Sequence, residues 1–139
     1  MLFRSFIIHL AAQIDVQRSI RFPDESMKIN FEGTKNVLNF CMENKIKNII
    51  IASTSAVYGS VHELPITEGS TKKPLSPYGE SKLQMENFTR EFSLNNELNC
   101  IILRFFNIYG SNQSTNYAGV ITKFFESIKN QKEIGRAHV

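Results

Sequence analysis

The sequence has 139 residues, of which 42% are hydrophobic, and its 16 basic and 13 acidic side chains give a formal net charge of +3. This length and composition predict one globular domain with a sizeable core and exclude a disordered chain. The basic residues are scattered, so no nucleic-acid partner is expected, and no apolar stretch approaches the roughly 20 residues of a membrane span.

The two ends of the chain look foreign to the rest. Residues 1–5 and 134–139 can both be reverse-translated into strings that resemble short-read sequencing adapters. We therefore expect the genuine protein to span residues 6–133, the alternative being two arbitrary termini. Without Arg4 and Arg136, 14 basic residues face 13 acidic ones, so the apparent basicity comes mostly from the ends.

Short β-branched runs alternate with longer helical patterns, which indicates βαβ units and an α/β fold with a parallel sheet. A buried strand is predicted over residues 6–12, followed by a loop that contains Pro23 and a helix over residues 26–45. The next buried strand covers residues 49–52. Residues 53–77 are rich in glycine and proline and are predicted to be mostly loop.

A second long helix is predicted to begin near Pro77 and to end around Asn95, with Met85, Phe88 and Phe92 on its apolar face. A third strand over residues 99–106, a polar loop over 107–117 and a last helix from about residue 120 complete the chain.

The spacing of Tyr78 and Lys82 carries the first chemical signal. Residues four apart on a helix share a face, so the phenol and the ammonium lie close together. A tyrosine with a pKa of about 10 is a poor base at neutral pH, and a nearby cation lowers that pKa. The pair fits the oxidation of an alcohol, whose proton must leave with the hydride. The alternative is an aromatic stem that packs beside a solvated lysine.

Hydroxyl groups follow the strand that ends at Ala52, in the segment from Ser53 to Gly59. The carboxyl ends of parallel strands are where open α/β sheets bind ligands, so Thr54 can hydrogen-bond a reacting hydroxyl. Ser53 and Ser55, taken separately, are also consistent with a turn that caps its own backbone.

Five motifs in order resemble the extended short-chain dehydrogenases/reductases of the NAD-dependent sugar-nucleotide epimerase/dehydratase family, and most closely the UDP-sugar 4-epimerases. The motifs are His9–Ala12, Asn30–Val37, Ser53–Gly59, Ser76–Lys82 and Arg104–Gly110. The resemblance implies a partial Rossmann-like fold, a doubly wound parallel sheet truncated at both ends.

The resemblance also assigns roles. It implies that Tyr78 is the base, that Lys82 lowers its pKa and holds the nicotinamide ribose, and that Thr54 orients the substrate. Tyr78 and Lys82 would line the NAD cofactor together with Ala11, Ala12, Asn30, Ser53 and Phe105. Ser55, Ala56 and Asn107 would face the nucleotide sugar. Alternatives remain for three of these residues, since Ala11 and Ala12 could simply admit close packing and Asn30 could be an ordinary surface amide. His9 is expected to be a core histidine with a protein partner.

One departure from the family pattern concerns NAD. The glycine-rich turn that receives the pyrophosphate is absent, because the first glycine of the chain is Gly33. We therefore expect residues 6–133 to be the C-terminal part of an NAD(P)-binding domain, inactive on its own. The choice between NAD and NADP stays open.

Ala56 decides the expected reaction class. Related dehydratases and decarboxylases typically have glutamate at this place, and alanine cannot exchange a proton. We therefore expect epimerisation at C4 of UDP-glucose or UDP-N-acetylglucosamine, the alternatives being a 4,6-dehydratase, a decarboxylase or a non-catalytic dinucleotide-binding protein.

The remaining expectations concern the surroundings of the protein. Cys41 and Cys100 are far apart in the sequence, which indicates reduced thiols in a cytoplasmic protein with no disulfide and no metal site. The parent protein is expected to be a homodimer that has no membrane or nucleic-acid partner.

Overall fold

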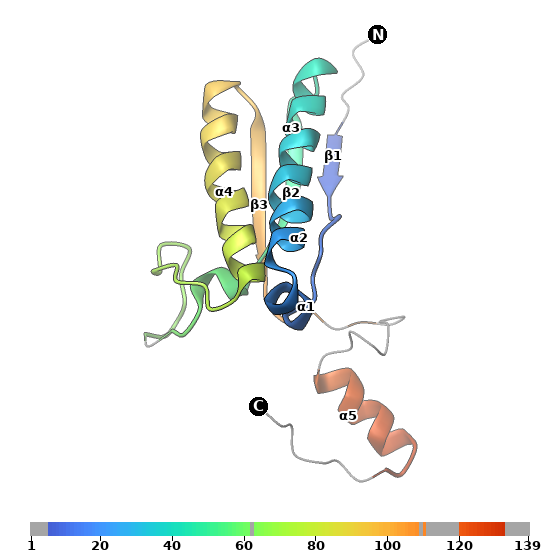
Figure 1. The fold of residues 1–139 in the computed structure, drawn as a ribbon. Coiled ribbons are helices and arrows are strands. Elements are labelled where there is room, and N and C mark those ends of the chain that lie inside the picture. The colour runs from blue at the N-terminus through green and yellow to red at the C-terminus, as the bar shows by residue number, and fades with distance from the viewer. Residues whose placement is uncertain (1–5, 62, 109, 111–119, 133–139) are drawn as a thin grey trace. The chain divides into compact units, whose positions relative to one another are not determined.

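The computed structural model describes residues 6–61, 63–108, 110 and 120–132. The adapter-like ends, residues 1–5 and 134–139, lie outside the described residues. The chain forms two compact units, residues 1–105 and 106–139, each of which is described by itself. The first unit is a three-stranded parallel sheet with helices along it, as the α/β prediction required (Figure 1).

The strands are β1 (Phe6–His9), β2 (Asn48–Thr54) and β3 (Asn99–Phe105), in the spatial order β1-β2-β3. Both pairings are parallel, and the register places Ile8 beside Ile50 and Ile50 beside Ile101. Because the three strands run the same way, their carboxyl ends lie at one edge of the sheet. The segments that follow β1 and β2 therefore start from the same edge.

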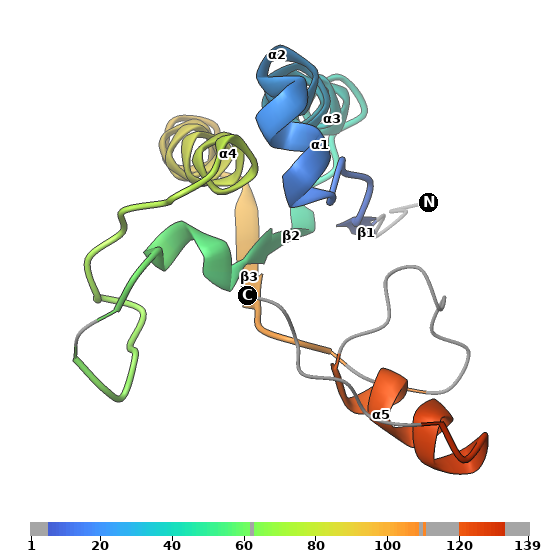
Figure 2. The ribbon, with the colours of Figure 1, turned by 60° about the horizontal axis from the view of Figure 1, so that its bottom comes forward.

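The helices of the first unit are α1 (Val16–Arg21), α2 (Pro23–Met27), α3 (Gly33–Glu43) and α4 (Pro77–Asn95), with a π-helical turn, η1 (Lys28–Glu32), between α2 and α3. All four α-helices lie on one side of the sheet (Figure 2).

The loop predicted before residue 26 was wrong, because α1 and α2 occupy most of it. The Asp15 carboxylate caps α1 by accepting a hydrogen bond of 2.9 Å from the Arg18 backbone N–H. Pro23 stands in the first turn of α2, where its missing N–H costs nothing. These two local signals start helices that are too short to show a hydrophobic period.

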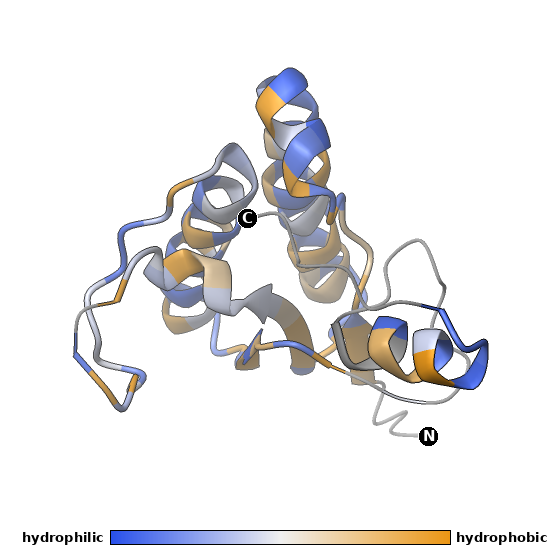
Figure 3. Ribbon diagram, turned by 90° about the horizontal axis from the view of Figure 1, so that it is seen from below, coloured by the Kyte–Doolittle hydropathy of each residue, from blue (hydrophilic) through white to orange (hydrophobic). Residues whose placement is uncertain are grey.

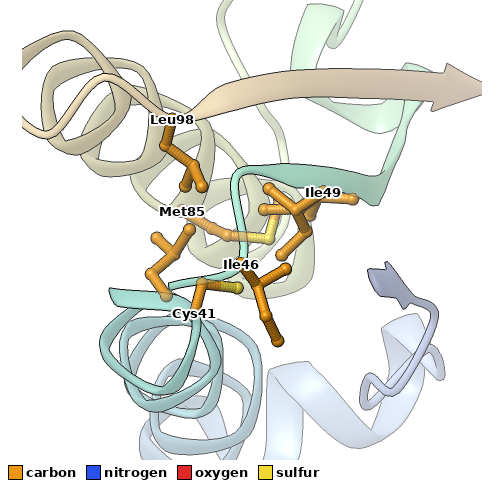
Figure 4. Packing of buried hydrophobic residues seen from close by; sticks show 7 residues of the cluster. Cys41, Ile46, Ile49, Met85 and Leu98 are labelled. Carbon is orange, nitrogen blue, oxygen red and sulfur yellow. The ribbon is translucent and has the colours of Figure 1, made fainter. Parts of the chain in front are cut away.

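The core lies between the sheet and the two long helices. Side chains from α3, β2 and α4 meet there, among them Cys41, Ile49 and Met85 (Figure 4). Phe88 and Phe92 are partly buried against this cluster, which contains Met85, so the predicted apolar face of the second long helix is confirmed; Val37 of α3 packs there as well. Hydrophobic and hydrophilic residues accordingly alternate along these helices (Figure 3).

The opposite face of the sheet carries apolar side chains that the helices of the first unit do not cover. Phe6 is 53% exposed, Ile8 60% and Ile101 55%. β-Branched and aromatic residues on one flat face are typical of a sheet that is buried on both sides. Within the described residues of the first unit, this face has no such cover.

The second unit contains one helix, α5 (Val120–Lys129), in the described part of the chain, which confirms the last predicted helix. Among the described helices, none has both the length and the apolar character that crossing a bilayer requires.

Candidate active site

The segment after β2 begins with a short 3-10 turn, η2 (Ser55–Tyr58), within the stretch that was predicted to be mostly loop. Thr54 starts this turn, because its side-chain oxygen accepts a hydrogen bond of 3.2 Å from the Ala56 backbone N–H. Val57 and Tyr58 are buried, whereas Ser55 and Ala56 are half-buried. The turn thus holds the Thr54 hydroxyl at the end of the strand.

Helix α4 begins beside this turn. Ser76 caps the helix by accepting a hydrogen bond of 3.1 Å from the Gly79 N–H, and Pro77 fills the first position. A Cβ at Gly79 would stand only 2.9 Å from the Ala56 carbonyl oxygen, so glycine allows the helix to come this close. The approach brings Tyr78 to Thr54, whose side chain acts to lower the pKa of the phenol.

Lys82 lies one helical turn after Tyr78 and is 4% exposed. Its Nζ donates a hydrogen bond of 3.0 Å to the Ala52 carbonyl oxygen. Burial lowers the pKa of Lys82 to about 8, although the Glu86 carboxylate acts in the opposite direction. The spacing prediction is therefore correct about position, since one helix carries both groups to the end of β2.

The structure favours the opposite direction for the tyrosine pKa from the one that the spacing predicts. Burial, the larger effect, raises the pKa of the Tyr78 phenol, and the hydrogen bond with Thr54 only partly offsets it. Lys82 was expected to lower this pKa, but its ammonium is directed to the Ala52 carbonyl. Four-residue spacing fixes which face a side chain occupies and leaves its solvation undetermined.

The loop after β1 carries Ala11, which is exposed, and Ala12, which is half-buried. Asn30 anchors this loop from the π-helical turn, where it is 1% exposed. Its Oδ1 accepts from the Gln13 N–H at 2.8 Å, and its Nδ2 donates to the Gln13 carbonyl at 3.0 Å and to Ser81 Oγ at 3.0 Å. Asn30 therefore ties the loop to the first turns of α4, and its direct contact with a dinucleotide stays a prediction.

The other predicted residues are distributed as follows. Ser53 is 5% exposed and points into the helix layer, and Phe105 ends β3 at the same edge as Thr54. Asn107 belongs to the second unit, so its role in the site stays a prediction. His9 Nε2 lies 3.1 Å from Thr34 Oγ1, the protein partner expected for a core histidine.

Sequence reasoning missed the ion pair between Glu86, which is buried, and Arg104, which is half-buried. Two signals could have identified it. Glu86 follows Lys82 by four residues and so shares its helix face. Arg104 is the one charged residue in the otherwise apolar strand around it.

A substitution at Gly59 tests the turn after β2. Gly59 has φ +66°, and an added Cβ would overlap the Lys73 carbonyl oxygen, so Gly59→Ala is expected to destabilise the fold by about 1 to 3 kcal/mol or more. Gly69→Ala is the control, because a Cβ there meets only Thr67 Oγ1 at 3.9 Å. Denaturant unfolding of both variants measures the difference, and equal stabilities would contradict the strained turn.

A family model described as "NAD dependent epimerase/dehydratase family" matches residues 4–138. A putative UDP-glucose 4-epimerase of Methanocaldococcus jannaschii is 39% identical over 131 residues, which cover 92% of this chain and 43% of that protein. The UDP-glucose 4-epimerase of Dictyostelium discoideum is 34% identical over 109 residues, which cover 78% of this chain and 32% of that protein.

Solved structures resemble the chain as well. The UDP-N-acetylglucosamine 4-epimerase of Methanobrevibacter ruminantium, in complex with UDP-N-acetylmuramic acid, superposes with a TM-score of 0.87 at 34% identity. The match covers 93% of this chain and 42% of that one. The Thermus thermophilus UDP-glucose 4-epimerase, in complex with NAD, has a TM-score of 0.83 at 31% identity, with 95% of this chain and 44% of that one covered. The chain therefore spans less than half the length of these relatives, and its Rossmann-like fold class is confirmed.

Proposed function

The chain belongs to the NAD dependent epimerase/dehydratase family, and we propose that residues 6–133 are the catalytic part of an NAD-binding domain in a sugar-nucleotide epimerase. One observation carries the proposal. The turn that begins at Thr54 and the first turn of α4, which carries Tyr78, meet at the carboxyl edge of the sheet, and Lys82 lies one helical turn further on. A base and an orienting hydroxyl at this edge suit the oxidation of a sugar alcohol.

The residues at this edge fit the nicotinamide end of NAD. Ala11 is exposed and has a small side chain, so a flat ring can approach the backbone after β1. Tyr78 and Lys82 would hold the adjoining ribose, and the wider lining proposed for the dinucleotide consists of Ala12, Asn30, Ser53 and Phe105. When bound, NAD supplies the acceptor and later the donor of a hydride. The pyrophosphate is assigned to a glycine-rich turn outside residues 6–133.

The roles of the protein groups follow from their chemistry. Tyr78 takes the proton of the reacting hydroxyl, and Thr54 holds that hydroxyl beside the phenol oxygen. Because burial raises the pKa of Tyr78, its ionised form needs a positive charge close by. We assign that role to Lys82, which is protonated below about pH 8 and lies one helical turn away, with its Nζ bonded to the Ala52 carbonyl oxygen. Ser55, Ala56 and Asn107 are proposed to face the nucleotide sugar.

The reaction class and the substrate are part of the same proposal. Ala56 cannot donate or accept a proton, which favours simple oxidation and reduction at one carbon over loss of water or carbon dioxide. Several relatives are UDP-glucose 4-epimerases, which supports UDP-glucose or UDP-N-acetylglucosamine as the substrate and C4 as the reacting carbon. A homodimer, expected from the family resemblance, stays a prediction.

The test uses the full-length protein, obtained by extending the coding sequence upstream of residue 6. Given UDP-glucose, UDP-N-acetylglucosamine and UDP-glucuronate in turn, it is expected to convert at least one of them into its C4 epimer with no net change in NADH. NMR of the product mixture measures the result, since each epimer has its own anomeric signals.

Other outcomes would contradict the reaction class. An accumulating 4-keto-6-deoxy sugar would identify a dehydratase, and release of carbon dioxide from UDP-glucuronate would identify a decarboxylase. NAD binding without any product would identify a non-catalytic protein.

A further inference from the structure

An ion pair between the buried Glu86 and the half-buried Arg104 lies next to the proposed catalytic residues along α4. Glu86 is completely buried on α4, one helical turn after Lys82. The Arg104 guanidinium reaches it from β3, with Nη2 2.6 Å from Oε2 and Nε 3.0 and 3.1 Å from the two carboxylate oxygens. This fork of charge-assisted hydrogen bonds is the geometry that arginine makes and lysine cannot.

The pair joins three segments around the site. The Ser53 hydroxyl, next to Thr54, donates a hydrogen bond of 2.5 Å to Glu86 Oε1. Arg104 Nη1 donates to the Tyr58 hydroxyl at 2.8 Å and to the Glu68 carbonyl oxygen at 3.1 Å. The guanidinium also lies 5.1 Å from the centre of the Tyr58 ring. Both ends of the segment from Ser53 to Tyr58 are therefore bonded to the same ion pair.

Stability alone does not account for such a pair. Removing two charges from water costs several kcal/mol per ion, and well-packed apolar residues of similar volume often stabilise a fold equally well or better. The bonds from this pair go to the strand end and turn that hold Thr54, and to the helix that carries Tyr78. The structure therefore points to a role in geometry.

We propose that Glu86 and Arg104 are positioning residues, which fix the segment from Ser53 to Tyr58 against α4 and so set the Thr54 hydroxyl relative to the Tyr78 phenol. This inference rests on the proposed function of Thr54 and Tyr78. The pair is not in contact with the reacting atoms and acts only through the residues that it holds. Glu86 also raises the pKa of the neighbouring Lys82, which helps to keep that side chain charged.

The decisive variant replaces both charges at once. Glu86→Leu/Arg104→Met in the full-length protein removes the ion pair and keeps the volume filled, so the melting temperature is expected to stay near the wild-type value. Turnover is nevertheless expected to fall by about 10- to 100-fold, because small displacements of positioned groups cost this much. A purely structural pair would give wild-type turnover in this double variant, and that result would overturn the proposal.

A milder variant covers the case in which the double variant does not fold. Arg104→Lys keeps the positive charge but loses the paired hydrogen bonds to Glu86 and the hydrogen bonds to Tyr58 and Glu68. It is expected to fold and to lose at least about tenfold in kcat, whereas Arg90→Lys, an exposed change on α4, is expected to leave kcat unchanged. Wild-type kcat in Arg104→Lys would overturn the proposal.

Hydrogen exchange separates this inference from the proposed function. Backbone amides of residues 54–58 are expected to exchange at least about tenfold faster in Arg104→Lys than in wild type, whether or not the protein is an epimerase. A wild-type protein without product would refute the proposed function alone. Unchanged exchange in this segment would refute the positioning role, even if the wild-type protein is active.

Discussion

Tyr78→Phe in the full-length protein is expected to lower kcat by about 100- to 10,000-fold, the usual contribution of a general acid or base. The substitution removes only the phenol oxygen, whose pKa the neighbouring Thr54 side chain acts to lower. The ring keeps its partly buried position at the start of α4, so NAD binding and the melting temperature are expected to change little. Steady-state kinetics and calorimetric titration with NAD measure the two quantities separately.

Glu80→Gln is the matched control for Tyr78→Phe. Glu80 lies in the same turn of α4 but is exposed, so its substitution is expected to leave both kcat and NAD affinity unchanged. If Tyr78→Phe keeps kcat within about twofold of wild type, Tyr78 is not the base. If kcat falls only together with NAD affinity, the phenol acts in binding and not in proton transfer.

Lys82→Met is expected to reduce turnover by a similar factor and, in addition, to weaken the retention of NAD. Lys82 is the buried cation closest along α4 to Tyr78, and burial has raised the pKa of that tyrosine. Without the positive charge, the phenolate form becomes rarer still. Lys47→Met, an exposed substitution, is the control and is expected to leave turnover at the wild-type level.

The same substitution has a defined signature in the pH dependence of stability. The folded-state pKa of Lys82 is about 8, against an ordinary value of 10.5, so between these two values the unfolded chain binds more protons than the folded one. Stability from this group therefore rises with pH across that window. Below pH 8 the fold carries the full cost of a buried ammonium.

The difference in unfolding free energy between wild type and Lys82→Met is therefore expected to change with pH. Between pH 8 and pH 10.5 it should shift by about 2 to 3 kcal/mol in favour of wild type, since one pKa unit corresponds to about 1.36 kcal/mol. Tyr78 lies nearby but is present in both proteins, so its titration largely cancels in the difference. Denaturant unfolding at several pH values without added NAD measures it. A constant difference across the window would contradict the lowered pKa.

The long elements were predictable because their signals are local. The apolar periodicity of α3 and α4 identifies the faces that pack around Cys41 and Met85, and the four-residue step from Tyr78 to Lys82 fixes their common face. Helix α1 was missed because six residues are too few to show a period. Its capping residue, Asp15, was the available signal.

The missed parts of the site depend on contacts between residues far apart in the sequence. Glu86 and Arg104 are 18 residues apart, and a charged residue in a sequence is ordinarily expected at the surface. Only the assembled sheet and helix show that the two compensate one another. The direction of the Tyr78 pKa likewise depends on how deeply α4 buries the ring, which no spacing rule contains.

The parallel register of the sheet also has a consequence for how the chain folds. Each partner of β2 lies roughly 40 to 50 residues away in the sequence, so the strands that the structure describes in the first unit form no hairpin from which pairing could begin. Closing such long segments costs entropy before any strand pair forms. During synthesis, β2 is made well before β3, and its edge stays open while helix α4 emerges from the ribosome. Local helix formation in α3 and α4 is therefore expected to precede the sheet, and β3 to be the last strand to join.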